Sequence, residues 1–159
     1  MDTVVTLAPS TADARYDADF VAWTQDQGRK LRDGRFDALD LANLAEEIES
    51  MGRAEKRELS NRLTVLLTHL LKWAVQPSRQ GRSWIATIRE QRVQSARILR
   101  ENPSLRPQLP DIFTEAYAVG RIRAYGETEL PETAFPDTCP WTWGQVLEQG
   151  FFPDPISSP

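Results

Sequence analysis

The apolar residues of this chain recur every three or four positions, and this period constrains the fold more than any other feature. Such spacing places side chains on one face of an α-helix, whereas a half-buried strand alternates apolar and polar residues. The clearest run is Leu59, Leu63, Leu66, Leu67, Leu70, Leu71 and Ala74. We find no alternating stretch of useful length and no internal repeat. The sequence therefore predicts an all-α fold, a helical bundle of about five to six helices with an extended Pro-rich C-terminal arm.

Capping residues indicate where the first helices begin and end. The spacing predicts a helix over 16–32, with Asp17 at its N-terminal cap and Gly34 just beyond its end. The next helix should begin near Asp37 or Asp40, whose carboxylates can accept the free N–H groups of a first turn. Its apolar stripe, formed by Leu41, Leu44, Ile48 and Met51, should line a buried face.

Glycine and proline divide the rest of the chain. At Gly52 either two helices meet or one long helix is kinked, and Pro77 ends that run. A helix capped by Ser83 should extend to residue 101. Another helix should begin at Pro110, because proline is tolerated in the first turn of a helix.

The last third is rich in proline and acid. It predicts an extended arm over 127–141, then a short helix over 143–149 capped by Thr142. We expect a flexible segment at 1–14, a single all-α domain at 15–153 and a tail at 154–159.

Composition limits the classes of function. Cys139 is the only cysteine among 159 residues, so the chain can form no internal disulfide and no thiolate metal cluster. A single cysteine is typical of a protein in the reducing cytoplasm. The N-terminus has no basic segment followed by a long apolar run, which argues against a secretory signal. No apolar run is long enough to span a bilayer, so no membrane partner is expected. The net charge of −4 disfavours nucleic acid as a partner.

Arg92 interrupts an apolar stripe at the position of a core residue. The stripe is Ile85, Ile88, Arg92, Ala96 and Leu99. The stem of Arg92 could pack in the stripe while its guanidinium reaches water. Alternatively, Arg92 could anchor a partner protein or pair with a buried carboxylate. Glu47 and Glu49 border the stripe of the acidic helix and are the predicted partners.

A polar cluster of Glu47, Glu49, His69, Trp84 and Arg92 between helices is a candidate small-ligand or catalytic site. The metal signature of helical bundles, Glu-x-x-His, is missing because Leu66 stands three residues before His69. The sequence thus predicts no metal, no cofactor and no recognisable catalytic motif.

Two further surfaces are candidates for binding a partner. Arg82, Arg89, Arg97 and Arg100 form a basic face that would suit a phosphate, a nucleic acid or an acidic partner. Trp141, Trp143, Phe151 and Phe152 form an aromatic tail that either docks on the bundle or binds a partner.

An ordered set of short motifs over residues 16–153 resembles a bacterial family, domain of unknown function 29. The motifs include Tyr16-Asp17-x-Asp19-Phe20-x-x-Trp23, Asn43-Leu44-x-Glu46-Glu47-Ile48-Glu49-x-Met51-Gly52, His69-Leu70-Leu71-Lys72-Trp73, Thr87-Ile88-x-x-Gln91-Arg92 and Phe135-Pro136-x-x-Cys139-Pro140-Trp141. The resemblance implies a small all-helical bacterial protein and supplies no activity. Whether the chain is an enzyme stays open. We expect a non-enzymatic interaction module that binds an unidentified protein or a second copy of itself.

Overall fold

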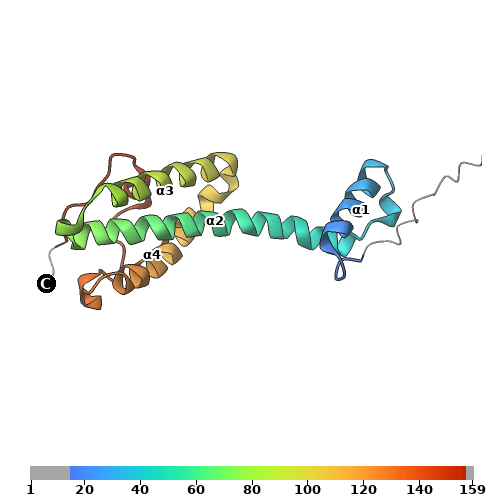
Figure 1. Cartoon of the computed structure of the whole chain (residues 1–159). Coiled ribbons are helices and arrows are strands. Elements are labelled where there is room, and N and C mark those ends of the chain that lie inside the picture. The colour runs from blue at the N-terminus through green and yellow to red at the C-terminus, as the bar shows by residue number, and fades with distance from the viewer. Residues whose placement is uncertain (1–14, 157–159) are drawn as a thin grey trace, which may run out of the picture. The chain divides into compact units, whose positions relative to one another are not determined.

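The computed structural model describes residues 15–156 and contains five α-helices in that range (Figure 1). They are α1 (Phe20–Arg32), α2 (Leu41–Val75), α3 (Arg82–Glu101), α4 (Leu109–Gly126) and α5 (Trp143–Leu147). Four 3₁₀ helices join them, at Phe36–Ala38, Pro77–Arg79, Pro103–Gln108 and Glu132–Ala134. No strand occurs between residues 15 and 156, and the all-α prediction is confirmed. The predicted flexible segment 1–14 and the end of the predicted tail, 157–159, lie outside the described residues.

The chain divides into two compact units, one ending at Met51 and the other beginning at Gly52. Helix α2 continues through this boundary as one helix, so the alternative of two separate helices at Gly52 is wrong. The single domain expected at 15–153 stays a prediction.

Helix ends follow local capping chemistry, with shifts from the predicted positions. Asp19, and not Asp17, caps α1, because its carboxylate accepts the Ala22 N–H at 2.9 Å. Gly34 follows the helix with a φ of 70°, the left-handed conformation that glycine adopts without steric cost. Helix α3 begins one residue before Ser83, with Gly81 at its N-cap, so the predicted serine cap is wrong.

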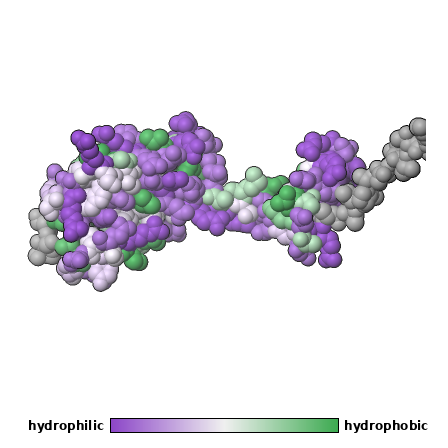
Figure 2. All heavy atoms as spheres, viewed as in Figure 1, coloured by the Kyte–Doolittle hydropathy of each residue, from purple (hydrophilic) through white to green (hydrophobic). Residues whose placement is uncertain are grey.

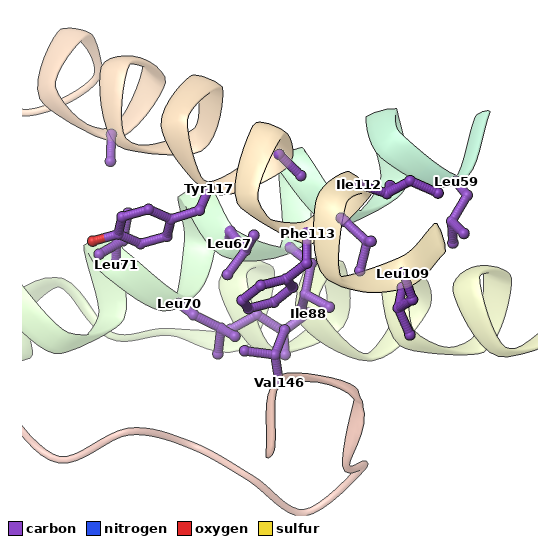
Figure 3. Close-up of a cluster of buried hydrophobic side chains, with 14 of the residues drawn as sticks. Leu59, Leu67, Leu70, Leu71, Ile88, Leu109, Ile112, Phe113, Tyr117 and Val146 are labelled. Carbon is purple, nitrogen blue, oxygen red and sulfur yellow. The ribbon is translucent and has the colours of Figure 1, made fainter. Parts of the chain in front are cut away.

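The core of the second unit forms where α2, α3 and α4 bury their apolar faces together (Figure 3). The leucine run of α2 lies inside it: Leu59, Leu63, Leu66, Leu67, Leu70 and Leu71 are fully buried. Ile88 of α3, Ile112 and Phe113 of α4, and Val146 of α5 complete the cluster. The periodic leucines predicted this helix and its buried face correctly.

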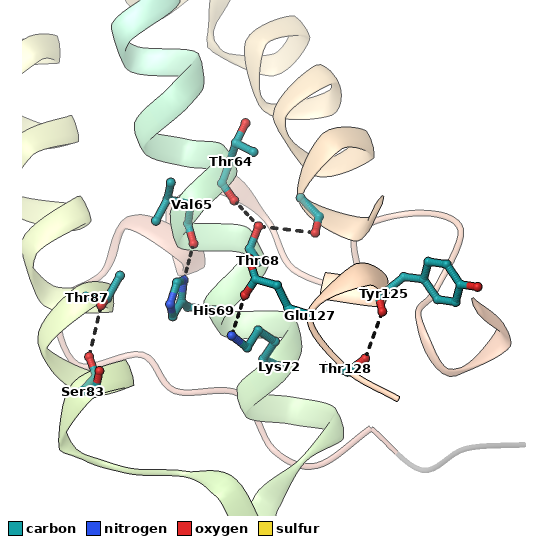
Figure 4. Close-up of polar contacts among 11 residues, drawn as sticks. Thr64, Val65, Thr68, His69, Lys72, Ser83, Thr87, Tyr125, Glu127 and Thr128 are labelled. Carbon is teal, nitrogen blue, oxygen red and sulfur yellow. Dashed lines mark hydrogen bonds and ion pairs between the residues drawn. The ribbon is translucent and has the colours of Figure 1, made fainter. Parts of the chain in front are cut away.

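Gly120 allows α4 to approach α2 closely. A Cβ at this position would lie 3.2 Å from the Thr64 carbonyl oxygen and 3.3 Å from the Thr68 nitrogen. The Thr68 hydroxyl lies 2.7 Å from the Thr64 carbonyl oxygen and 3.3 Å from that of Gly120 (Figure 4). The two helices are therefore in backbone contact, where no larger side chain fits without a shift.

The extended arm predicted over 127–141 is not confirmed. This segment contains the 3₁₀ helix Glu132–Ala134, and Phe135 is buried in the core. The Tyr117 hydroxyl donates to the Pro136 carbonyl at 2.6 Å, and Arg121 Nε donates to the Phe135 carbonyl at 3.1 Å. Thr142 then caps α5 as expected, in a reciprocal capping box with Gln145, although α5 ends at Leu147.

Candidate interaction surface

The interior of the first unit is small and polar. Among residues 15–51 only Trp23, Gln27 and Lys30 are buried. The Trp23 indole N–H donates to the Asp40 carboxylate at 3.2 Å, and the Gln27 side-chain oxygen accepts the Asp40 backbone N–H at 2.8 Å. Lys30 forms an ion pair with Asp26 at 2.8 Å. The bonds of Trp23 and Gln27 to Asp40 tie α1 to the start of α2 without an apolar core.

Asp40 caps α2. It is one of the two residues, Asp37 and Asp40, that the sequence offered as the cap of this helix. Its carboxylate accepts the Asn43 side-chain N–H at 2.7 Å and the Asn43 backbone N–H at 3.3 Å. The side-chain bond from Asn43 is the largest cause of a pKa below the usual value for Asp40. The carboxylate is therefore held charged at the N-terminus of the helix, where the helix dipole favours it.

Three aromatic rings form one edge of the first unit. Tyr16 contacts Trp23 edge-on at 4.9 Å between ring centroids, and Phe20 lies 5.8 Å from both rings. The Tyr16 hydroxyl donates a short hydrogen bond to Glu47, and this bond is the main cause of a raised pKa for Tyr16. Glu47 is thus engaged within the first unit.

The apolar stripe of α2 (Leu41, Leu44, Ile48 and Met51) was expected to line a buried face, and that expectation is wrong. Leu41, Ile48 and Met51 are 66%, 67% and 69% exposed, and Leu44 is half-buried. At 100° per residue the four side chains fall within a sector of about 80°. Figure 2 shows hydrophobic side chains gathered over the N-terminal part of α2. The first unit exposes further large apolar residues at Phe20, Val21, Leu31 and Phe36.

A polar cavity of about 360 Å³ opens beside α1 and is lined in part by Arg15, Asp17 and Asn43. Trp23, Gln27 and Asp40 also line it, and all three already form the hydrogen bonds described above. The wall of the cavity is therefore polar, but the side chains of Trp23, Gln27 and Asp40 in it already form hydrogen bonds within the unit.

Arg92 is fully buried in the second unit, but its partners are backbone carbonyls. Its guanidinium donates to the carbonyls of Val146 at 2.8 Å, Gln149 at 3.2 Å and Phe151 at 2.6 Å. Burial lowers the pKa of Arg92 to about 10, so it remains charged at neutral pH. The predicted carboxylate partner, Glu47 or Glu49, is wrong: three carbonyls from one C-terminal segment take its donors instead.

This segment, residues 146–156, is held against α2 and α3, and we call it the C-terminal strap. The Phe152 ring lies 4.8 Å from Trp73 and 5.5 Å from the Arg92 guanidinium. At its end the Ile156 N–H donates to the Ala74 carbonyl at 3.0 Å. Phe151 contacts Trp141 edge-on at 6.1 Å. Three members of the predicted aromatic tail are therefore at least half-buried, and only Trp143, 45% exposed, faces solvent.

His69 lies near Lys72, a residue that the sequence did not single out as a site candidate (Figure 4). Trp84 also lies close to Lys72. The Lys72 ammonium pairs with Glu127 at 2.6 Å and lies 4.8 Å from the centre of the Trp84 ring. His69 Nδ1 donates to the Val65 carbonyl at 2.9 Å, and burial lowers the pKa of the imidazole. Glu47 and Glu49 belong to the other unit, so the contacts of His69 within its own unit do not test the expected polar cluster. That cluster stays a prediction.

The predicted basic face is exposed on α3 at Arg82, Arg89, Arg97 and Arg100. The opposite face buries Ile88, Gln91, Arg92, Ser95, Ile98 and Leu99, whereas Ala96 is exposed. The buried stripe is thus rotated slightly from the predicted one. Binding of an anion by the basic face stays a prediction.

Comparisons with known proteins place the chain in a family. Within residues 15–156, every helix is too short or too polar to cross a bilayer, and no three His, Cys, Asp or Glu side chains gather as metal ligands would. No curated protein and no solved structure matches the chain. The family model described as "Domain of unknown function DUF29" matches residues 15–152, nearly the whole length. The chain therefore belongs to the domain of unknown function 29 family.

Proposed function

We propose that the protein is a protein-interaction module whose working surface is the apolar stripe of α2 in the first unit. The observation that supports this most strongly is the exposure of Leu41, Ile48 and Met51 along one narrow sector of the helix. Apolar groups gathered in this way mark interaction sites more often than scattered ones do.

Energetics favour a partner for this helix segment. No residue of α2 before Leu59 is buried, so residues 41–58 gain little from packing. Helices in water obtain most of their stability from an apolar face packed against another element. Burial of one large apolar side chain is worth about 1.5–3 kcal/mol. A partner that covers the stripe would supply the packing that this segment lacks.

The other predicted surfaces receive less support as sites of association. Phe151 and Phe152 are engaged in the C-terminal strap, so the aromatic tail mainly serves the fold. The alternative is a small-ligand site or an enzyme built on Glu47, His69 and Arg92. In such a site Arg92 could donate few hydrogen bonds to a ligand, because three backbone carbonyls already accept them.

Photo-crosslinking tests the proposal with a matched control. A photoreactive residue replaces Ile48 in one variant and Ile122 of α4 in another, because the two isoleucines are 67% and 66% exposed. In the native cell, the probe at 48 should form a defined protein adduct that the probe at 122 does not form. The partner identified by mass spectrometry should then bind the purified chain and fail to bind Ile48→Glu. Equal labelling from both positions would contradict the proposal.

A further inference from the structure

We infer that the partner of the α2 apolar stripe is a second copy of this chain. This inference rests on the proposed function and names the occupant of the same surface. Three properties of the first unit support it: the few apolar side chains buried in its described part, the spacing of its stripe and the distribution of its charges.

The described part of the first unit, residues 15–51, leaves most of its large apolar side chains exposed. Small domains whose core buries few apolar side chains usually need disulfides, metals or oligomerisation for stability. The sequence places its only cysteine at 139, so no disulfide can stabilise this unit. Within residues 15–51, Trp23 is the one buried large apolar residue, while Leu41, Ile48 and Met51 are exposed. Association would supply the missing core.

The stripe has the spacing of a helix-to-helix seam. Leu41, Leu44, Ile48 and Met51 are separated by three, four and three residues, which is the a and d pattern of two heptads. A stripe of about 80° is narrower than the face that a helix turns to a globular core, and it matches a coiled-coil seam. The surface that fits such a seam is another helix with the same spacing. A second copy presents this helix in any symmetric pair.

Charges in the first unit are separated in a way that suits self-association. Among exposed side chains, residues 29–35 present three bases and one acid, whereas residues 37–49 present three acids and no base. In a two-fold pair each contact occurs twice, so the acidic part of one copy can face the basic part of the other. Such complementarity steers association and disfavours wrong partners. The same chain therefore provides both an apolar seam and opposite charges for its own pairing.

Sedimentation equilibrium on the purified full-length chain tests the inference. The wild type should sediment as a dimer that dissociates on dilution. Ile48→Glu should raise the dimer dissociation constant by about 100-fold, because it places a charge in the seam. The matched control Ile122→Glu, at an equally exposed isoleucine of α4, should leave the dimer unchanged. Far-UV circular dichroism at a concentration at which the wild type is monomeric should show the same helix content in all three chains, because both isoleucines are exposed.

Three other outcomes would overturn the inference, and they separate it from the proposed function. A dimer that Ile48→Glu does not weaken would use another surface. A monomeric wild type whose residue 48 still crosslinks to a different, identified protein would leave the proposed function standing and assign the stripe to that protein. A monomeric wild type with no specific adduct at residue 48 would contradict both.

Discussion

Arg92 and Val146 are 54 residues apart in the sequence, and a 2.8 Å hydrogen bond joins the Nε of the first to the carbonyl oxygen of the second. Two more donors of the same guanidinium bind the carbonyls of Gln149 and Phe151. One buried side chain thus satisfies three backbone acceptors in a segment that has little regular structure of its own. The C-terminal strap is held in place by this contact and by Phe152 on Trp73.

Removal of the guanidinium should release the strap. We expect Arg92→Ala to lower the free energy of unfolding by about 3 kcal/mol, because buried carbonyls lose their donors. Arg92→Lys should cost less, since an ammonium keeps the charge but cannot reproduce the planar fork. Urea unfolding followed by circular dichroism measures both changes. Arg89→Ala, at an exposed position of the same helix, is the control and should stay within about 0.5 kcal/mol of wild type. Equal stability of Arg92→Ala and Arg89→Ala would contradict the role of Arg92.

Two glycines in helices should respond to alanine in opposite directions. Gly120→Ala should destabilise the protein by about 1–3 kcal/mol, because the new methyl group meets the backbone of α2 at 3.2–3.3 Å. Gly52→Ala should stabilise it by about 0.5–1 kcal/mol, because Gly52 lies inside α2 with open space around it. Thermal unfolding of the two variants tests this pair. A stabilising Gly120→Ala would show that the two helices can move apart at no cost.

The pKa of His69 predicts how stability depends on pH. Burial holds the folded-state pKa below the ordinary value of 6.5, so the neutral imidazole is favoured in the fold. Between the two pKa values the unfolded chain binds more protons, and stability therefore rises with pH. This contribution is fully present above about pH 6.5 and is lost as the pH falls through the folded pKa. Urea midpoints measured from about pH 7.5 to about pH 5.5 should fall less steeply in His69→Gln than in wild type. Parallel curves would exclude His69 as the source.

Cys139 should react slowly in the folded protein. It is half-buried beside Trp141, and burial raises the pKa of its thiol to about 11. Since only the thiolate is nucleophilic, alkylation near pH 8 should be slower than in the unfolded chain by about tenfold to a hundredfold. The rate of iodoacetamide labelling, with and without urea, checks this. Equal rates in the two states would show that Cys139 is accessible and ionises normally.

Local pattern was sufficient to predict the helices and much of the core. The leucines of α2 repeat every three or four residues, which fixes both the helix and its buried face. Arg92 was identified as a buried residue for the same reason. Its partners could not be found from the sequence, because any residue can present a backbone carbonyl and these three lie 54–59 positions away.

The stripe of α2 shows the opposite limitation. Leu41, Leu44, Ile48 and Met51 have the same spacing whether they face the interior of their own chain or the surface of another. The sequence therefore predicted an apolar face correctly but assigned it to the wrong environment. Caps were displaced for a simpler reason, since Asp17 and Asp19 offer the same acceptor within two residues of each other, and only the backbone decides which one reaches the N–H.

Peroxide oxidation of Met51 is the measurement that most directly tests the central claim, that a partner copy covers the stripe. The thioether lies in the stripe and is exposed in the single chain, where Met51 has 69% of its surface accessible. With free methionine as the reference, mass spectrometry of the peptide that contains Met51 gives the rate at low and high protein concentration. If a second copy covers the stripe, Met51 should be oxidised slowly at high protein concentration and faster on dilution, and in Ile48→Glu it should be oxidised fast at both concentrations. A rate for Met51 that is equally fast in every sample would contradict it.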